Sequence, residues 1–589
     1  MIAVKNGLLS RAGIASILLA AFVFCWYFLL NRYTILMQEQ SQMFLFTRSY
    51  LMQHLHQPGG LAVWAGAFLT QFFLYPPAGA GIYTLVFFAL YREYRKTLTR
   101  LSVFEKSASV PYIPALLLLP AIAGIQFRVG IELNLLAALA FFRLLVAVVK
   151  YKYAPAMIFG VVVTGYIVTA GNVALTAVLF LIFCWQRRPK RCLIRIAAVI
   201  AAWWSAPWLF GYALYPVSVD GAYWLHTPWD KMYTGVSVFW KIACLSVVVL
   251  PLAGMAGRKI GAGRKMVRIA DATVIAAMLF SVVITRRPTS ERIMHMMHKS
   301  GTGNWSEVLA VSKKTATAPL QCFYLNLSLQ QMGALPDSMF HYDQIGVSGL
   351  FPDLLDYFHC SAAGDLFYRL GLINELRHCS YESMVSRNYD REYDIRSVKR
   401  LLQCADAAND SALAGKYRYL TGKTLFYKDE LSSGGAKHDI PVTAAGDVLL
   451  RGNDSALEAI LRANPLHRPA FEYLMAYYML EMDYDKAKEC FDTYYAGLEY
   501  PSLPVHYAEL LTLYQSVNKL DNRFYDAYPV PMAVRERFDM IDVLIPYVFA
   551  DEKIRQTVER QFKDTYWFYV AFPLIDISHT NENEKKIPY

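Results

Sequence analysis

The sequence contains none of the short motifs that mark many enzyme classes. It has no Walker-type phosphate loop, no GxGxxG leading into a helix, no nucleophile elbow and no HExxH pair. Each of these motifs holds a phosphate, a nucleophile or a zinc ion through a fixed spacing of residues. Nucleotide-dependent, hydrolase and zinc-protease chemistry therefore find no support in the sequence.

Cysteine is sparse, and its spacing forms no pattern. The nine cysteines include no CxxC pair and no His/Cys spacing of metal ligands, which argues against a zinc or redox centre. Four lie in or beside apolar segments, where we expect them to pack: Cys25, Cys184, Cys192 and Cys244. Five lie in the later polar half, where a disulfide can form outside the cytoplasm but at least one thiol stays free: Cys322, Cys360, Cys379, Cys404 and Cys490.

Charged residues are also few, at 18% of the chain, whereas 55% of residues are hydrophobic and 14% aromatic. This composition predicts that part of the chain lies in lipid. The net charge of +11 does not indicate nucleic-acid binding, because Arg and Lys concentrate in short clusters between apolar segments (92–106, 187–195 and 258–268). Membrane topology explains such clusters.

Nine apolar segments are predicted to cross the membrane. They are residues 12–30, 78–90, 110–125, 133–149, 154–169, 173–184, 193–210, 236–255 and 269–284. A tenth, residues 61–74, lies between Pro58-Gly59-Gly60 and Pro76-Pro77 and is shorter than the about twenty residues that a span needs. We expect it to be re-entrant or interfacial.

The basic clusters give the orientation. They alternate with nearly neutral connections, so the positive-inside rule places the clusters and the N-terminus in the cytoplasm if residues 61–74 do not cross. A short true span there, with the N-terminus outside, is the alternative. With a cytoplasmic N-terminus, residues 1–285 are predicted to form a transmembrane domain in a bacterial inner membrane, and residues 286–589 a periplasmic domain.

One stretch, residues 33–83, carries the only functional resemblance. A lone carboxylate, Glu39, follows the first span, and then come an amphipathic run through His56, a Gly-rich turn and the short apolar segment ending at Pro76-Pro77. This layout resembles the first outer loop of polytopic, lipid-dependent glycosyltransferases of the C-type fold (GT-C), including the YfhO-like branch. It differs from the commoner pattern in having a single Glu instead of an Asp or an acidic pair.

The resemblance implies roles for several residues. Glu39 would be the base that deprotonates the acceptor, or it would hold a divalent metal. A divalent metal is the only cofactor that the resemblance leaves open. Arg48 or Arg128 would bind the phosphate of a polyprenyl-phosphate sugar. Further candidates for substrate binding are Gln42, His54, His56, Glu132, Asp220 and Trp224. A local ion pair between Arg128 and Glu132, and an interfacial aromatic belt around Trp224, are the simpler structural alternatives. A solvated or helix-capping carboxylate is the alternative for Glu39.

The later half has helical periodicity with a recurring spacing. Phe471, Leu474, Met475 and Tyr478, followed by Ala487 and Phe491, match the large and small positions of a tetratricopeptide repeat, and Pro465 falls where the preceding repeat would end. The spacing recurs near residues 320, 367 and 507. These segments resemble degenerate tetratricopeptide-type hairpins, with residues 432–446 as a loop and residues 579–589 as a frayed tail.

The sequence thus predicts an all-α protein with a polytopic transmembrane domain and a soluble helical-repeat solenoid. Two functions remain open. One is a membrane glycosyltransferase that uses a lipid-linked sugar. The other is a non-enzymatic envelope scaffold whose repeats bind a protein partner.

Overall fold

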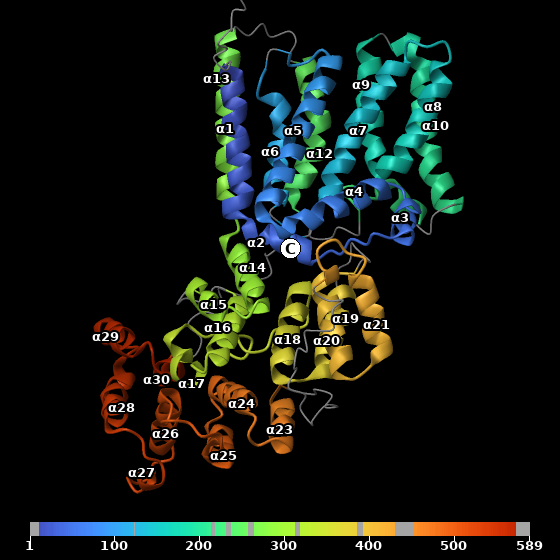
Figure 1. Cartoon of the computed structure of the whole chain (residues 1–589). Helices are drawn as coiled ribbons and strands as arrows, with labels where there is room; N and C mark the ends of the chain where they lie inside the picture. Colours follow the sequence, from blue (N-terminus) through green and yellow to red (C-terminus); the bar gives the residue numbers. More distant parts are fainter. Residues whose placement is uncertain are drawn as a thin grey trace, which may run out of the picture.

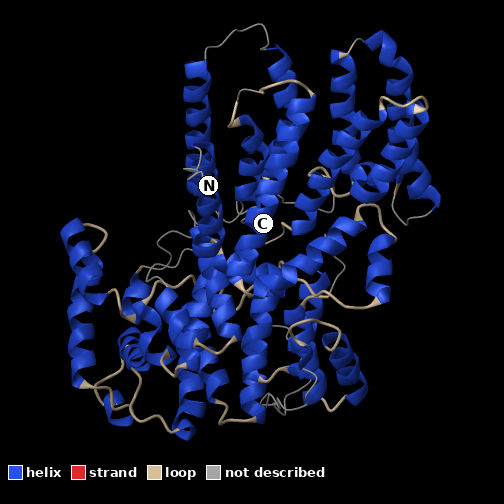
Figure 2. Ribbon diagram, turned by 45° about the horizontal axis from the view of Figure 1, so that its top comes forward, coloured by secondary structure: helices blue, strands red, loops and turns tan. Residues whose placement is uncertain are grey.

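The computed structural model describes residues 11–105, 107–122, 124–125, 127–187, 189–213, 218–230, 237–256, 264–312, 318–385, 393–429 and 453–572. Throughout these ranges the chain is helical and forms no strand, apart from an isolated bridge between Ile345 and Val347 (Figure 2). The all-α prediction is confirmed. The predicted loop at 432–446 and the predicted tail at 579–589 lie outside the described residues.

Each predicted apolar segment corresponds to a helix of one bundle (Figure 1). The helices are α1 (Arg11–Cys25, continued by the π-helical turn η1, Trp26–Leu30), α5 (Pro76–Arg100), α6 (Ile113–Ile122, preceded by η3, Val110–Tyr112), α7 (Val129–Val148), α8 (Ala154–Thr169), α9 (Val173–Gln186), α10 (Pro189–Ala213), α12 (Val238–Ala256) and α13 (Arg264–Ile284). Their inward faces share one apolar core. We call this part the long-helix bundle.

Only some of these helices have the length and composition of a membrane span. Four stretches do: Val129–Val148, Ala154–Gln186 (α8 and α9 with the 3-10 turn η4, Ala170–Asn172), Cys192–Tyr212 and Val238–Ala256. There are up to six if two bent helix pairs each count as one span. The others are limited by charge or length, since α5 is charged over its second half and α6 has ten residues. The described chain thus has several helices apolar enough to cross a membrane, and nine crossings remain a prediction.

Short helices cover one end of the bundle. They are α2 (Arg32–Gln40), α3 (Arg48–Leu55), α4 (Gly60–Thr70) with η2 (Gln71–Leu74), and α11 (Val219–Trp224). The chain bends by 69° into α2. Gly66 lets α4 lie directly against α7, because a Cβ there would be 2.3 Å from the backbone nitrogen of Gly130. Residues 61–74 therefore form a helical segment packed on the bundle end, and their entry into lipid remains a prediction.

The rest of the chain forms a second group of helices below that end (Figure 1), which we call the C-terminal helical region. Its members are α14 (Pro288–Gly301), α15 (Trp305–Val311), α16 (Pro319–Gln331), α17 (Leu335–Ser338), η7 (Met339–His341), α18 (Tyr357–Leu370), α19 (Ile373–Val385), α20 (Ile395–Ala407), α21 (Ser411–Thr421), α23 (Asn453–Ala463), α24 (Arg468–Glu481), α25 (Tyr484–Tyr494), η8 (Tyr495–Leu498), α26 (Val505–Val517), α27 (Phe524–Ala527), α28 (Met532–Leu544), η9 (Ile545–Tyr547), α29 (Glu552–Phe562) and α30 (Tyr566–Ala571).

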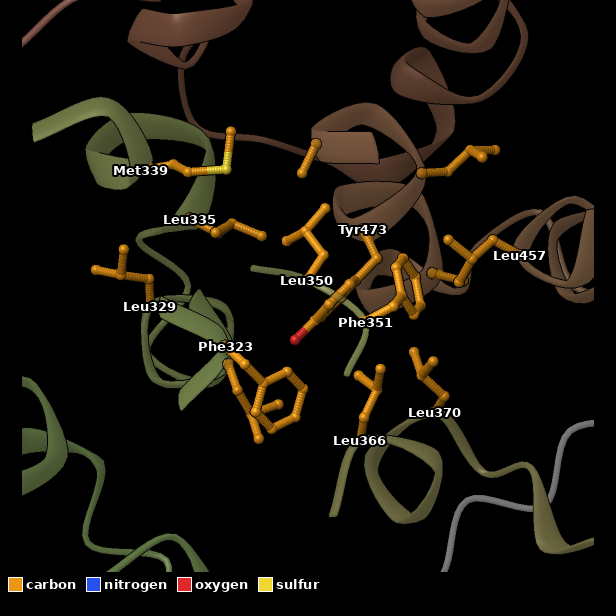
Figure 3. Close-up of a cluster of buried hydrophobic side chains, with 14 of the residues drawn as sticks. Phe323, Leu329, Leu335, Met339, Leu350, Phe351, Leu366, Leu370, Leu457 and Tyr473 are labelled. Carbon is orange, nitrogen blue, oxygen red and sulfur yellow. The ribbon is translucent and has the colours of Figure 1, made fainter. Parts of the chain in front are cut away.

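Helices that follow one another in this region pack together, as α18 does on α19 and α24 on α25. Figure 3 shows Phe323, Leu350, Leu366 and Tyr473 converging on a common core. The residues expected at repeat positions, Phe471, Leu474 and Met475, are all buried. Burial alone fits any packed helix pair, so the tetratricopeptide-type solenoid remains a prediction.

All nine cysteines are free thiols. Eight are buried, which agrees with packing roles, whereas Cys25 is exposed on α1. No disulfide therefore closes the C-terminal helical region in this structure.

Candidate functional site

The helix α2 joins the two parts of the molecule. On the bundle side, the Gln38 amide donates to the carbonyl oxygens of Gly124 (3.0 Å) and Phe127 (3.2 Å), and the Tyr83 hydroxyl donates to Gln38 Oε1 (2.8 Å). Gln38 is buried. A buried amide whose oxygen and nitrogen both have partners fixes its helix in position, so α2 is held firmly on the bundle.

The other side of α2 contacts α14. The Glu291 carboxylate accepts hydrogen bonds from the backbone nitrogens of Tyr33 (2.6 Å) and Thr34 (3.0 Å) and from the Thr34 hydroxyl (2.7 Å). It thus caps the otherwise unpaired amides in the first turn of α2, where negative charge is favourable. The Tyr33 ring also stacks on His295, with ring centroids 3.7 Å apart.

Glu39 lies in the last turn of α2, between the bundle and the C-terminal helical region, outside the long helices. Its side chain is 4% exposed, and the Tyr427 hydroxyl lies 2.8 Å from each carboxylate oxygen, where it can donate to either. Burial raises the pKa of Glu39 to about 8, although the Tyr427 hydrogen bond and the Lys399 charge oppose the shift. In this arrangement Glu39 is mostly protonated at neutral pH.

The segment that carries Tyr427 is held against the bundle end at several points. Phe46 donates its backbone N–H to the carbonyl oxygen of Lys423 (2.8 Å). The Phe426 ring contacts Phe72 and Tyr75, with centroids 5.9 Å and 5.7 Å away. The segment just after α21 therefore covers Glu39 and excludes water from it.

Sequence reasoning missed Tyr427 and Lys399 as neighbours of Glu39. Tyr427 is 388 residues away along the chain. Lys399 lies on α20 with its ammonium group 4.4 Å from the centroid of the Tyr427 ring. Neither residue belongs to a local motif, and only the docking of the helical region brings them to Glu39.

Arg128 is close to Glu39 in the fold but contacts protein groups. Its guanidinium donates to the carbonyl oxygens of Gln38 (3.1 Å) and Ser41 (3.2 Å) and to the Ser41 hydroxyl (3.1 Å). A cation at this end of α2 stabilises the last carbonyls of the helix. Arg128 thus holds the turn after Glu39, and its role as a phosphate partner remains a prediction.

Glu132 occupies the first turn of α7 and is 2% exposed. Among the described residues its Oε2 atom has no hydrogen-bond partner. The carboxylate is close enough to interact electrostatically with Tyr27 and Tyr83 in the bundle. Of the predicted site residues, Glu39, Gln42, Arg128 and Glu132 are thus all buried at the same end of the bundle.

The candidates on α3 are placed differently. Arg48 and His56 are exposed, whereas His54 is buried. The Nδ1 atoms of His54 and His56 contact the carbonyl oxygens of Tyr50 (2.8 Å) and Met52 (2.5 Å). Throughout the described part of the chain, no group of three or more His, Cys, Asp or Glu side chains could hold a metal ion.

Trp224 and Asp220 belong to α11, beside the same end of the bundle. Trp224 is 52% exposed and its ring centroid is 6.2 Å from that of Trp229. The side chain of Asp220 lies outside the described residues. Two exposed indole rings fit a sugar platform and an interfacial belt equally well, so both readings of Trp224 stand.

The comparison with known proteins gives a single match. The model of a family described as "Family of unknown function (DUF6057)" matches residues 8–573. Neither a curated protein nor a solved structure matches the chain. The match extends over both the long-helix bundle and the C-terminal helical region, so the joint between them at α2 lies within the family unit.

Proposed function

The chain belongs to the DUF6057 family of unknown function, and we propose that it is a membrane-bound glycosyltransferase. It would take its sugar from a polyprenyl-phosphate donor at the outer face of a bacterial inner membrane. Glu39 would be the general base. The GT-C resemblance of residues 33–83 suggests the reaction class, and the environment of Glu39 supports the role of that residue.

The observation that carries this proposal is the contact between Tyr427 and Glu39. A general base must lie about 2.6–3.2 Å from the hydroxyl whose proton it removes. The Tyr427 hydroxyl already stands at such a distance, 2.8 Å from either carboxylate oxygen. An acceptor hydroxyl would take the same position after the segment of Tyr427 moves away.

The same movement would prepare Glu39 for catalysis. Burial is what raises its pKa to about 8, so contact with water would lower that pKa toward its ordinary value and ionise the carboxyl at neutral pH. The ionised Glu39 would accept the proton of the acceptor hydroxyl while the hydroxyl oxygen bonds to the anomeric carbon. The bond from that carbon to the phosphate oxygen would break, and polyprenyl phosphate would leave with both electrons of that bond.

Glu39→Gln tests the proposal directly. It keeps the size of the side chain but removes its basicity, so turnover should fall about 10²–10⁴-fold. The assay is sugar transfer by membranes supplied with polyprenyl-phosphate sugars. Because the acceptor is not known, a second assay compares the glycan and glycolipid profiles of a deletion strain complemented with wild type or with Glu39→Gln.

Glu291→Gln is the matched control, because Glu291 of α14 is a second carboxylate at α2, and it hydrogen-bonds to the first turn of that helix instead of the end that carries Glu39. It should retain near wild-type transfer. A deletion strain with unchanged glycans, or full rescue by Glu39→Gln, would remove Glu39 from the mechanism.

A second function is favoured by the same contacts read differently. The Tyr427 hydroxyl lies within hydrogen-bond distance of both oxygens of Glu39, and the Phe426 ring packs against Phe72 and Tyr75. Such contacts suit a permanent anchor that displays the C-terminal helical region as a tetratricopeptide-like, protein-binding scaffold. Tyr427→Phe separates the two readings. If the protein is an enzyme, Tyr427→Phe should still transfer sugar. If it is a scaffold, Tyr427→Phe and Glu39→Gln should both weaken the contact between the C-terminal helical region and the bundle. Faster proteolysis after Lys423 would measure that weakening.

A further inference from the structure

A cluster of three arginines surrounds one carboxylate in the C-terminal helical region. Asp365 on α18 is 2% exposed and accepts hydrogen bonds from Arg400 (2.9 Å) and from Arg396, both on α20. Arg369 lies one turn further along α18 and interacts electrostatically with Asp365 and with Arg400. Within the described ranges, Arg369 itself has no carboxylate at ion-pair distance. Asp394 also interacts electrostatically with Arg396, so the three arginines and two aspartates leave one positive charge in excess.

Aromatic rings hold these guanidinium groups in place. Arg369 lies over the rings of Trp305 and Tyr368, 5.1 Å from each centroid. Arg400 lies 4.1 Å from the centroid of the same Tyr368 ring. Stacking on aromatic faces stabilises a cation and fixes the plane of its guanidinium, so two arginines are pre-oriented beside one tyrosine.

The protein only partly compensates this charge. Arg369 is in the last turn of α18, where the helix dipole supplies about half a negative charge. Burial and the neighbouring Arg400 both lower the pKa of Arg369, with burial the larger cause, which shows that the surroundings disfavour its charge. An anion between Arg369 and Arg400 would remove this penalty.

We propose that Arg369 and Arg400, framed by Trp305 and Tyr368, form a binding site for phosphoryl groups. Guanidinium forks match the oxygen geometry of phosphate and can bind it through paired hydrogen bonds. Because α15 and α18 belong to the helical region outside the long-helix bundle (Figure 1), the phosphoryl group is one carried by a molecule in solution. The site does not depend on the proposed role of Glu39.

The test uses the purified full-length protein in detergent and inorganic pyrophosphate as the probe, with isothermal titration calorimetry as the measurement. Wild type should bind pyrophosphate, and Arg369→Gln should weaken binding by about tenfold or more, since a charge-assisted hydrogen bond contributes about 1.5–3 kcal/mol and 1.4 kcal/mol is tenfold in affinity. Arg369→Lys keeps the charge without the fork and should weaken binding less. Unchanged thermal unfolding would show that both variants fold.

Arg535→Gln is the matched control, because Arg535 also stacks on a tyrosine, 4.5 Å from the Tyr525 centroid, and no second arginine among the described residues lies over that ring. It should bind pyrophosphate as wild type does. Absence of binding to the wild type, or equal weakening by Arg535→Gln, would overturn the proposal.

A lipid arm distinguishes the source of the phosphate. The protein is placed in nanodiscs of phosphatidylcholine with or without phosphatidylglycerol, and its unfolding temperature is measured. We expect no effect of phosphatidylglycerol that depends on Arg369. A stabilisation by phosphatidylglycerol that Arg369→Gln abolishes, together with no pyrophosphate binding, would refute a ligand in solution and assign the site to lipid headgroups.

Discussion

At the scale of single residues, Glu39 shows what burial does to a carboxyl group. The sequence singled it out as a lone acid after the first apolar segment. The alternation of polar and apolar residues could not predict which side chains would contact it. Its partners, Tyr427 and Lys399, come from the far half of the chain. Glu39 could therefore be singled out from the sequence, whereas its closed state, buried beneath Tyr427, depends on long-range packing that no local pattern encodes.

This closed state predicts a pH dependence. Burial raises the pKa of Glu39 from its ordinary value of 4.5 to about 8. Between these two pH values the folded protein holds a proton that the unfolded chain, with its water-exposed carboxylate, has released. The stabilisation from the buried, protonated carboxyl is complete below about pH 4.5 and is lost as the pH rises toward 8. Unfolding temperatures of wild type and Glu39→Gln are compared from pH 5 to 9.

We expect the wild type to lose stability relative to Glu39→Gln as the pH rises to about 8. Above that pH the difference in stability between the two proteins should stay constant. Taking the difference between the two proteins cancels the other titrating groups. Parallel curves over the whole range would show that Glu39 does not titrate in this window.

Among the helices, apolar runs in the sequence predicted where a helix forms more accurately than where it begins and ends. Residues 154–169 were predicted as a segment and are α8 itself, because a Pro at its start and a reversal at Ala170 mark both ends. The helix α5 instead extends to Arg100, ten residues past the apolar part, since Glu93 accepts hydrogen bonds from Lys96 (2.7 Å) and from Arg143 on α7. Ion pairs of this kind continue a helix without any hydrophobic signal.

The hairpin α24–α25 carries an element-scale prediction. Phe471 is fully buried, with its ring 5.9 Å from that of Tyr507 and 6.3 Å from that of Tyr500. Phe471→Ala should therefore lower the free energy of unfolding by about 3–5 kcal/mol through lost contacts and a cavity. Phe549→Ala is the control, because that ring is 83% exposed and its removal should be near neutral. Denaturant titration of both variants checks this, and equal effects would refute the packing of Phe471.

At the scale of the whole molecule, the joint at α2 ties the two parts into one body. Met37 of α2 belongs to the core of the helical region, and Met43, just after α2, packs with Ile395 and Val398 of α20. Both methionines lie in the stretch 33–83 that resembles an outer loop, and the sequence did not predict their burial, because a buried interface between distant segments leaves no periodic signal. Composition could separate the two parts but could not show how they meet.

The arrangement of the bundle yields the last prediction. The helices α5, α9 and α12 end near the basic clusters at 92–106, 187–195 and 258–268, and α7 ends just before a fourth basic pair, Lys150 and Lys152. Those helix ends lie away from the C-terminal helical region, which packs on the opposite end (Figure 1). If the basic clusters are cytoplasmic, the helical region faces the periplasm. Alkaline phosphatase folds into an active enzyme only outside the cytoplasm, so a fusion after Thr302 should be active and a fusion after Arg264, at the start of α13, inactive. The reverse pattern would invert the molecule, place Glu39 at the cytoplasmic face, and exclude a lipid-linked donor on the outer face as its substrate.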